Sequence, residues 1–417
     1  MAASVLRQHI SHEPAESANR PTIVFGITHS QTCIILAGRL QTFRAAGYRV
    51  IVVSSPGDHL QRVSEEAGVE AIAVPISRHI SPLSDLVSFI RLYRLLGRLK
   101  PDIVEFSTPK AGMLGTAAAM LQGVRCRIYM LRGLRLETVR GFKRWVLLSA
   151  ERIASACAHV VLCNSDSLRN LALALGIAPA QKLCLLGDGS SNGVDVDRFS
   201  PGPTWVRAEL GIPDKVPVIG FVGRFTRDKG LEDLFISFIF LSKSEPALHL
   251  LLVGWFDASE DALSSGLRDR ILSHPRIHCT GFVADTAPYY RAMDMMVLPT
   301  WREGFPNAIL EAAASGIPVI STECTGSRDA VVPEVTGLLI PPGYPEAIFE
   351  SVLKLLRDSR RRKRMGRAAR AWVQEHYNEQ RVLTHTAAYY RSLLNDVPRH
   401  LSMGEVGDEI NSVFLSS

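Results

Sequence analysis

The chain contains no cysteine pair spaced to hold a metal ion or to begin a disulfide framework. Its seven cysteines are an odd number, they are scattered, and none belongs to a C-x-x-C pair. Such a set disfavours both zinc ligation and a small disulfide-stabilised fold. We expect most of these thiols to be small apolar core residues in a reducing cytoplasm.

Long apolar runs are also missing. The N-terminal segment 1–20 is polar and has no apolar core, so it is not interpreted as a signal peptide. No stretch reaches the roughly eighteen uncharged apolar residues that a membrane span needs. The best candidate, Trp145–Cys163, is interrupted by Glu151 and Arg152. We therefore predict a cytoplasmic protein without a membrane span, with an unstructured tail at 398–417.

Two common nucleotide-binding loops are absent. No G-x-x-x-x-G-K-[ST] sequence occurs, which excludes a P-loop enzyme. The glycines between Gly187 and Gly193 follow a predicted strand and imitate a dinucleotide-binding fingerprint. However, the third glycine comes one position late, and Val194–Asp197 does not open a helix, so we do not predict dinucleotide binding there.

What the chain does have is a globular composition with a small excess of positive charge. Of its 417 residues, 47% are hydrophobic and 21% are charged, so disorder is not expected as the main state. At roughly 100–200 residues per domain, this length predicts two or three domains. The net charge of +6 permits an anionic partner, and it leaves nucleic acid, a phospholipid surface and nucleotide phosphates open.

Short β-branched runs alternate with longer helical patterns along most of the chain. Several runs are apolar throughout, as expected for strands buried on both faces of a parallel sheet. The alternation pauses at Asp188–Pro203, which is rich in Gly, Ser, Asp and Pro, and then resumes. Two doubly wound α/β domains are therefore predicted, with a ligand site in the cleft between them. The predicted strands are Thr22–Ile27, Arg49–Ser54, Glu70–Val74, Asp102–Phe106, Arg127–Leu131 and His159–Cys163, then Val218–Val222, Leu248–Val253, Ile277–Thr280, Met295–Leu298 and Val319–Ser321.

A basic turn follows the first strand of the second half. That strand ends at Gly223, Arg224 comes next, and Lys229 follows five residues later. A strand-to-helix turn presents backbone N–H groups at a helix N-terminus, where anions bind. Arg224 offers a planar fork and Lys229 a mobile point charge, which together suit a diphosphate, although a solvated basic turn would look the same.

A second segment, Thr300–Glu311, strengthens the interpretation as a ligand site. A strand leads into a loop with Gly304 and Pro306, and an apolar helix starts near Asn307, so free N–H groups again face an anion. Glu303 lies in this loop and Glu311 lies one turn inside the helix. Carboxylates this far apart suit the recognition of sugar hydroxyls better than a shared-proton pair, whereas either one alone could be a capping or surface residue.

These residues resemble the donor-binding half of retaining glycosyltransferases of family 4. The resemblance spans roughly 22–395, and its most specific part is the pair Glu303 and Glu311. It implies the GT-B fold, in which two Rossmann-like domains face a cleft. Further matching segments are Gly281-Phe282, Gly316–Ile320 and Gly337–Pro341, and, in the first half, Ser107–Gly112, Leu131–Arg135 and Gly189–Asp195, which resemble the bacterial capsule and exopolysaccharide branch.

The resemblance also implies a division of the chain. We expect a disordered segment at 1–20, an acceptor-binding domain at 21–195 and a nucleotide-sugar-binding domain at 196–377. A C-terminal helix at 378–397 would return to the first domain, before the tail at 398–417.

Roles follow by position in the motif. The resemblance implies that Arg224 and Lys229 stabilise the departing diphosphate and that Glu303 contacts the donor sugar. Glu311 would bind the ribose hydroxyls. The other residues expected to bind substrate are Gly223, Phe282, Gly304, Phe305, Pro306, Asn307, Lys110 and Arg132.

The residue at position 132 and the expected cofactors need separate comment. Many relatives carry a histidine where this chain has Arg132, and because arginine is a poor proton shuttle, we name no general base. No cofactor and no metal ion are expected, because protein cations balance the charge and no Asp-x-Asp motif lies near the site.

The positive charge is concentrated in residues 125–152, which contain eight Arg and Lys residues but only two acidic residues, Glu137 and Glu151. Trp145 lies among them, so this amphipathic segment could dock on an anionic membrane, or could simply be a helix with a solvated face.

The function that the resemblance implies is transfer of a hexose or N-acetylhexosamine from a UDP-sugar to a lipid-diphosphate-linked glycan at the inner membrane face. The alternatives are a UDP-sugar epimerase or hydrolase, a sugar phosphate synthase, or a non-enzymatic membrane- or nucleic-acid-binding protein, and nucleic acid is the least favoured partner.

Overall fold

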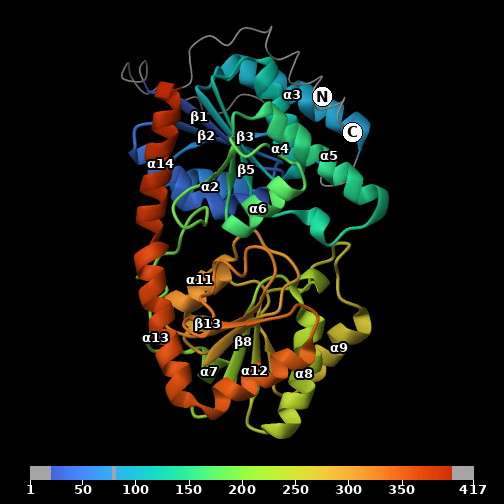
Figure 1. Cartoon of the computed structure of the whole chain (residues 1–417), viewed down its shortest axis with the longest axis vertical. Helices are drawn as coiled ribbons and strands as arrows, with labels where there is room; N and C mark the ends of the chain where they lie inside the picture. The colour runs from blue at the N-terminus through green and yellow to red at the C-terminus, as the bar shows by residue number, and fades with distance from the viewer. Residues whose placement is uncertain (1–19, 78–80, 397–417) are drawn as a thin grey trace, which may run out of the picture.

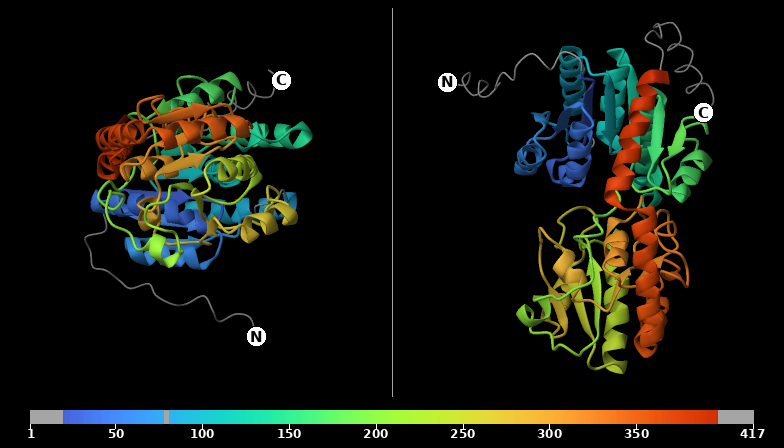
Figure 2. Two further views of the ribbon diagram at one scale, coloured as in Figure 1. Left: turned by 90° about the horizontal axis from the view of Figure 1, so that it is seen from below. Right: turned by 90° about the vertical axis from the view of Figure 1, so that its left-hand side faces the viewer.

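Two parallel β-sheets, one in each half of the chain, form the framework of the computed structural model, which describes residues 20–77 and 81–396. The sheets occupy two lobes stacked along the long axis of the molecule (Figures 1 and 2). All strand pairs within both sheets are parallel. This arrangement is the predicted pair of doubly wound Rossmann-like domains.

The first sheet has seven strands in the order β3-β2-β1-β4-β5-β6-β7. Its chain order reverses between β1 and β4, which places a topological switch point at their carboxyl ends. Its strands are β1 Thr22–Gly26, β2 Arg49–Ser54, β3 Glu70–Ala73, β4 Ile103–Ser107, β5 Cys126–Leu131, β6 Val160–Cys163 and β7 Leu183–Leu185. Its helices are α1 Ala37–Ala45, α2 Asp58–Ala67, α3 Pro82–Leu99, α4 Pro109–Leu121, α5 Gly141–Cys157 and α6 Asp166–Ala174, with 3-10 helices at Ser30–Leu36 and Arg135–Glu137.

The second sheet has six strands in the order β10-β9-β8-β11-β12-β13, with the corresponding switch between β8 and β11. Its strands are β8 Val218–Val222, β9 His249–Val253, β10 Ile277–Cys279, β11 Met295–Leu298, β12 Val319–Thr322 and β13 Gly337–Ile340. Its helices are α7 Val206–Glu209, α8 Leu231–Ser244, α9 Ser265–Ser273, α10 Ala287–Tyr290, α11 Asn307–Ala314, α12 Pro345–Arg357 and α13 Ser359–His376, with a 3-10 helix at Arg227–Lys229.

The last helix, α14 Glu379–Asp396, runs back along the first domain (Figure 1). Tyr390 is fully buried there, in the same apolar cluster as Phe25 of β1 and Phe43 of α1. The ring of Tyr390 lies edge-on to that of Phe43 at 5.1 Å. One chain crossing therefore joins the lobes through Asp188–Pro203, and a second joins them through α13 and α14.

Apolar side chains cover both faces of the first sheet, which explains why its strands are apolar throughout. Ile23 and Phe25 of β1 face one cluster, whereas Val24 between them faces another. The glycine run at 187–193 lies in the connection between the domains and does not open a helix. Within the described residues, no helix is long and apolar enough to cross a membrane. Apart from Arg20, the predicted segments 1–20 and 398–417 lie outside the described residues.

Candidate functional site

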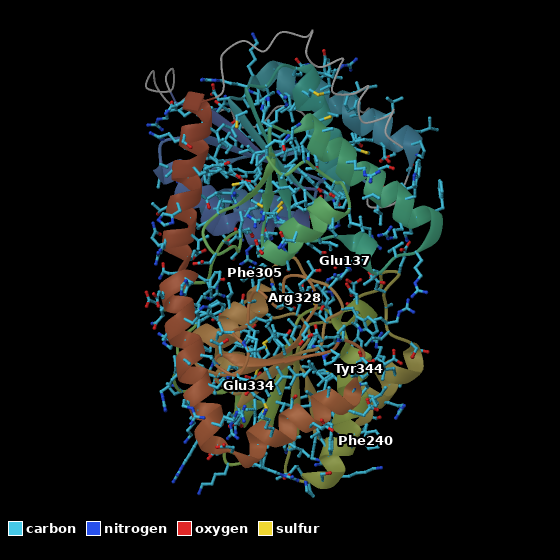
Figure 3. The ribbon with its side chains drawn as sticks, in the orientation of Figure 1. Glu137, Phe240, Phe305, Arg328, Glu334 and Tyr344 are labelled. Carbon is cyan, nitrogen blue, oxygen red and sulfur yellow. The ribbon has the colours of Figure 1, made fainter. Side chains whose placement is uncertain are left out.

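Two cavities lie between the domains, at the carboxyl ends of the strands of both sheets. The smaller has a volume of about 290 Å³ and the larger of about 570 Å³. Arg132 and Glu303 line both, so the two cavities share a wall. Figure 3 shows Phe305 and Glu137 at this junction of the lobes.

The smaller cavity brings together most of the predicted donor residues. The second domain contributes Gly223 at the end of β8, Lys229 from the 3-10 helix, and the loop before α11. Arg132, after β5, comes from the first domain. The predicted residues that line this cavity are Gly223, Lys229, Glu303, Phe305, Pro306, Asn307 and Arg132.

Lys229 and Glu303 form an ion pair in this cavity, with Nζ and Oε1 2.5 Å apart. Both side chains are largely buried, at 18% and 13% exposed, so water screens the pair only weakly. The next residue, Gly230, has a backbone φ of +69° and packs so closely that a methyl group there would lie 1.9 Å from the Pro299 carbonyl oxygen, so only glycine fits at this position.

Arg224 lies beside these residues and donates a hydrogen bond from Nη1 to Asp257 Oδ2 at 2.8 Å. Burial alone would raise the pKa of the Asp257 carboxyl, but hydrogen bonds from Arg224 and from the Ser259 backbone N–H outweigh it and lower the pKa. Arg224 is 41% exposed, so its guanidinium is accessible to a ligand. It lines neither of the two cavities.

Glu311 is held inside the second domain. Its Oε2 accepts hydrogen bonds from the hydroxyl groups of Tyr290, at 2.8 Å, and Thr286, at 3.4 Å. Burial raises the pKa of the Glu311 carboxyl, and the hydrogen bonds from Tyr290 and Thr286 and the charge of Arg198 only partly offset this. Like Arg224, Glu311 lines neither interdomain cavity.

Phe282 is the third predicted residue outside both cavities. It is 57% exposed and lies edge-on to Trp255, with ring centroids 5.5 Å apart. Phe282 follows β10 and Trp255 follows β9, so both rings lie at the carboxyl ends of the strands of the second sheet, as Gly223 does after β8. Phe282 was a predicted site residue, whereas Trp255, which follows the neighbouring strand β9, was not.

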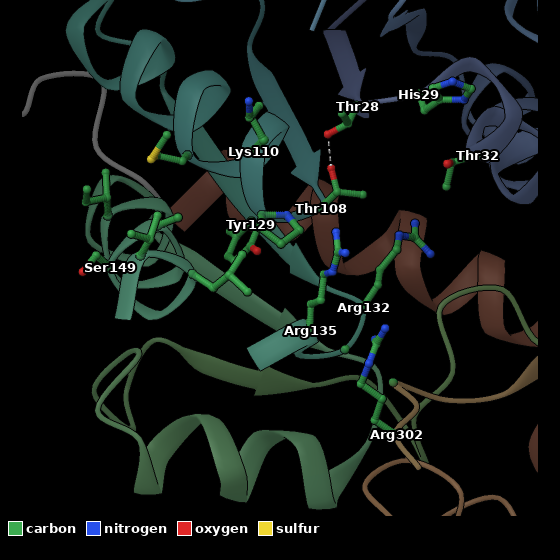
Figure 4. A pocket seen from close by; sticks show the side chains of 18 of the residues that line it. Thr28, His29, Thr32, Thr108, Lys110, Tyr129, Arg132, Arg135, Ser149 and Arg302 are labelled. Carbon is green, nitrogen blue, oxygen red and sulfur yellow. Dashed lines mark hydrogen bonds between the residues drawn. The ribbon is translucent and has the colours of Figure 1, made fainter. Parts of the chain in front are cut away.

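The larger cavity is bounded mainly by the first domain (Figure 4). One wall is the face of α5 that carries Trp145, Val146 and Ile153. Opposite lie Lys110 and the ends of two loops, where Thr28 after β1 and Thr108 after β4 share a hydrogen bond of 2.6 Å between their hydroxyl oxygens. The predicted residues that line this cavity are Lys110, Arg132, Glu303 and Gly304.

Four cations line this cavity: Lys110 on α4, and Arg132, Arg135 and Arg302 on the side toward the second domain (Figure 4). Lys110 pairs with Asp85 at 2.7 Å. Thr28, Thr108, Arg135 and Arg302 were not among the predicted site residues. The last three lie in segments that the sequence did indicate, but the sequence does not show that their side chains line one cavity.

The two domains contact each other backbone to backbone at this site. A methyl group at Gly304 would lie 1.9 Å from the Arg132 carbonyl oxygen. Thr325 donates a hydrogen bond to Glu137 Oε2 at 2.7 Å, and Ser167 at the start of α6 donates its backbone N–H to Asp329 at 3.1 Å. The two domains are therefore in direct contact beside the cavities.

The basic segment 125–152 does not form one uniform surface. Arg135 and Lys143 both pair with Glu260 of the second domain. Arg152 donates hydrogen bonds to the backbone oxygens of Leu175 and Gly176. Two aromatic residues of α5, Phe142 and Trp145, are instead 78% and 62% exposed.

Two Rossmann-like domains meet at a cavity lined by a basic residue and a carboxylate, Lys229 and Glu303. Two family models match this architecture domain by domain. "Glycosyl transferase 4-like domain" matches residues 37–189, and "Glycosyl transferases group 1" matches residues 216–358. The chain belongs to this family of glycosyltransferases, with the GT-B fold.

Similar proteins agree with this assignment. The chain is 34% identical to the capsular polysaccharide biosynthesis glycosyltransferase CapM of Staphylococcus aureus over 372 residues, which are 89% of this chain and 97% of CapM. It is 28% identical to the UDP-Gal:α-D-GlcNAc-diphosphoundecaprenol α-1,3-galactosyltransferase of Escherichia coli over 299 residues, 70% of this chain and 76% of that one.

Solved structures share the fold. Sucrose-phosphate synthase of Thermosynechococcus elongatus superimposes with a TM-score of 0.77 at 21% identity, covering 90% of this chain and all (100%) of that one. HepE of Anabaena, in complex with UDP-glucose, gives a TM-score of 0.75 at 20% identity, covering 89% and 99%.

Proposed function

We propose that this glycosyltransferase moves a hexose or N-acetylhexosamine from a UDP-sugar to a lipid-diphosphate-linked glycan, with retention at the anomeric carbon and without a metal ion. The observation that carries the donor half of this proposal is the smaller cavity. There, Lys229 and Glu303 lie together in front of the N-terminus of α11.

The donor's diphosphate is proposed to lie between Lys229, Arg224 and the first N–H groups of α11. Cations and a helix N-terminus stabilise the charge that develops on the diphosphate as the bond to the sugar breaks. Lys229 and Arg224 are each paired with a carboxylate, Glu303 and Asp257, so each exchanges or shares that partner when the diphosphate enters.

Glu303, relieved of part of its pairing, would then hydrogen-bond a hydroxyl group of the donor sugar. We propose that Glu311, with Tyr290 and Thr286 fixing one oxygen, binds the ribose hydroxyls through the other. Burial disfavours the ionised form of Glu311 and raises the pKa of its carboxyl. A ribose hydroxyl that donates a hydrogen bond to this carboxylate would favour the ionised form again.

Transfer would occur on one face of the sugar. The acceptor oxygen bonds to the anomeric carbon as the bond from that carbon to the diphosphate oxygen breaks, and the acceptor's proton passes to the departing phosphate. This route needs no protein base, in keeping with Arg132 at the position where many relatives carry a histidine.

The acceptor is proposed to occupy the larger cavity. Its cationic lining residues, Lys110, Arg135 and Arg302, suit a diphosphate, and its apolar α5 wall suits a lipid. Two similar proteins support this class of acceptor. One is the Escherichia coli galactosyltransferase described above. The other is the N,N'-diacetylbacillosaminyl-diphospho-undecaprenol α-1,3-N-acetylgalactosaminyltransferase of Campylobacter jejuni, 25% identical over 337 residues.

We further propose that the enzyme works at the inner face of the cytoplasmic membrane, as a peripheral protein on anionic lipid. Exposed apolar residues on α5 and on the N-terminal half of α3 support this placement, and both helices pack beside α4. Exposed arginines accompany them, which suits anionic headgroups. The apolar residues are Phe142 and Trp145 on α5, and Leu83, Leu86, Val87 and Ile90 on α3.

Isothermal titration with UDP tests the donor half. We expect UDP to bind, Lys229→Met to weaken binding about tenfold or more through loss of a charge-assisted hydrogen bond, and Lys243→Met on the outer part of α8 to leave it unchanged. Binding that survives Lys229→Met at full strength would reject this site. Turnover of a UDP-sugar without acceptor at the rate seen with acceptor would instead indicate an epimerase or a hydrolase.

A further inference from the structure

A charged network lies enclosed in the first domain, directly behind the wall that the two cavities share. It consists of Arg39 on α1, Glu105 on β4 and Tyr390 on α14, exposed by 1%, 1% and 0%. Charged side chains this deeply buried are kept only where partners compensate the loss of hydration. These three residues stand 66 and 285 positions apart in the chain, and the donor and acceptor roles proposed above use none of them.

The three side chains bind one another closely. Arg39 Nη2 lies 2.8 Å from Glu105 Oε2. The Tyr390 hydroxyl donates to the same carboxylate oxygen at 2.6 Å and accepts from Arg39 Nη2 at 2.7 Å. The phenol of the C-terminal helix therefore completes the pair of Arg39 and Glu105.

Arg132 joins this network to the cavities. Its Nη2 lies 3.7 Å from Glu105 Oε1, and its Nη1 donates to Ser191 Oγ at 2.7 Å. Arg39 Nη1 donates to the backbone oxygen of the same serine at 3.0 Å. Both guanidinium groups are thus fixed by one carboxylate and one serine in the connection between the domains.

The network has more positive than negative charge. Two guanidinium groups share one carboxylate, and among the described residues Nε of Arg39 and both Nε and Nη2 of Arg132 have no hydrogen-bond partner. Burial lowers the pKa of the Arg132 guanidinium to about 10; Glu105 opposes this shift, and Arg39 adds to it. An anion beside Arg132 would relieve this imbalance.

The charges that line the smaller cavity show where such an anion fits. Its charged lining residues are Arg132, Lys229 and Glu303. Because Lys229 and Glu303 pair with each other at 2.5 Å, the positive charge left over on the wall is that of Arg132.

We propose that Arg39, Glu105 and Tyr390 are positioning residues that hold Arg132 against the donor's diphosphate, whose negative charge completes the network. This inference rests on the proposed UDP-sugar donor. It assigns Arg132 an electrostatic role opposite Lys229, with the diphosphate between cations of both domains. It also makes α14 part of the site, since its Tyr390 fixes the carboxylate that orients Arg132.

The test compares UDP with uridine, which has the same base and ribose but no phosphate, in titrations of the full-length protein. We expect Tyr390→Phe, which removes only the hydroxyl, to reduce the preference for UDP over uridine about tenfold. Tyr389→Phe, the neighbouring residue on α14, is the matched control and should leave the preference unchanged. A role confined to folding would weaken UDP and uridine by the same factor, and that result would overturn the proposal.

Arg132→Gln provides a second variant that stays informative if Tyr390→Phe does not fold. Because the change removes the excess charge, we expect an unliganded melting temperature at least as high as that of the wild type, together with the same loss of preference for UDP. An unchanged preference in Arg132→Gln would refute the inference. If UDP binding still depends on Lys229 in that case, only the inference fails; if the wild type itself does not prefer UDP to uridine, the proposed donor fails with it.

Discussion

Glu151 gives the most quantitative prediction about the stability of the first domain. It lies on α5, beneath the apolar wall of the larger cavity, and is 1% exposed. The Tyr129 hydroxyl donates a hydrogen bond to its Oε2 at 2.5 Å. Burial raises the pKa of this carboxyl from 4.5 to about 7, and the hydrogen bond from Tyr129 limits the shift.

The sign of the effect follows from proton binding. Below about pH 4.5 both the folded and the unfolded chain carry the proton, so the residue adds no pH dependence. Between about pH 4.5 and pH 7 the unfolded chain loses the proton first, so the free energy of unfolding falls as the pH rises. At about 1.4 kcal/mol for each unit of pKa difference, the loss by about pH 8 amounts to about 3 kcal/mol.

Glu151→Gln removes this penalty. The glutamine carbonyl still accepts the hydrogen bond from Tyr129, while its buried NH₂ group costs about 1 kcal/mol. We expect the variant to be about 2 kcal/mol more stable than the wild type at about pH 8 and no more stable at about pH 5. Denaturant unfolding followed by circular dichroism at both pH values measures this difference, with Glu350→Gln on the exposed side of α12 as control. A stability difference between variant and wild type that is the same at both pH values would refute the reasoning.

Three further predictions concern closure, metal and membrane. Gly304→Ala should lower kcat/KM about tenfold or more, because a methyl group 1.9 Å from the Arg132 carbonyl oxygen prevents the close approach of the two domains. Small-angle scattering should then show a more open particle, and an unchanged scattering profile would contradict this. Chelation by EDTA should leave transfer unaffected, and a loss restored by added Mg²⁺ would reject the metal-independent mechanism. Replacing both Phe142 and Trp145 with serine should reduce flotation with anionic liposomes while UDP binding stays intact, and unchanged flotation would remove α5 from the proposed membrane surface.

The fold could be predicted closely because its signal is local. Apolar β-branched runs marked the central strands, and Arg49–Ser54, Val218–Val222 and Met295–Leu298 match β2, β8 and β11. The bounds of β7 and β13, Leu183–Leu185 and Gly337–Ile340, were not predicted. A run of three or four residues gives little periodicity, although β10, equally short, was found.

The site was predictable only where its residues are close in sequence. The Thr300–Glu311 segment indicated Glu303 and the loop before α11, and the structure places both at the smaller cavity. The network behind Arg132 was not predictable, because Glu105 on β4 and Tyr390 on α14 are 285 positions apart and meet only when α14 packs onto the first domain. For the same reason the sequence could not show that Lys143, in the basic segment 125–152, pairs with Glu260 of the other domain.

The central claim is tested most directly by a transfer reaction followed by mass spectrometry. The full-length protein is incubated with each UDP-sugar and a lipid extract that contains diphosphate-linked glycans, with no added metal. The account predicts that one UDP-sugar adds a single hexose or N-acetylhexosamine to the lipid-linked glycan, and that Lys229→Met and Glu303→Gln abolish this addition. Transfer that persists at full rate in both variants, or the absence of transfer from every UDP-sugar, would contradict it.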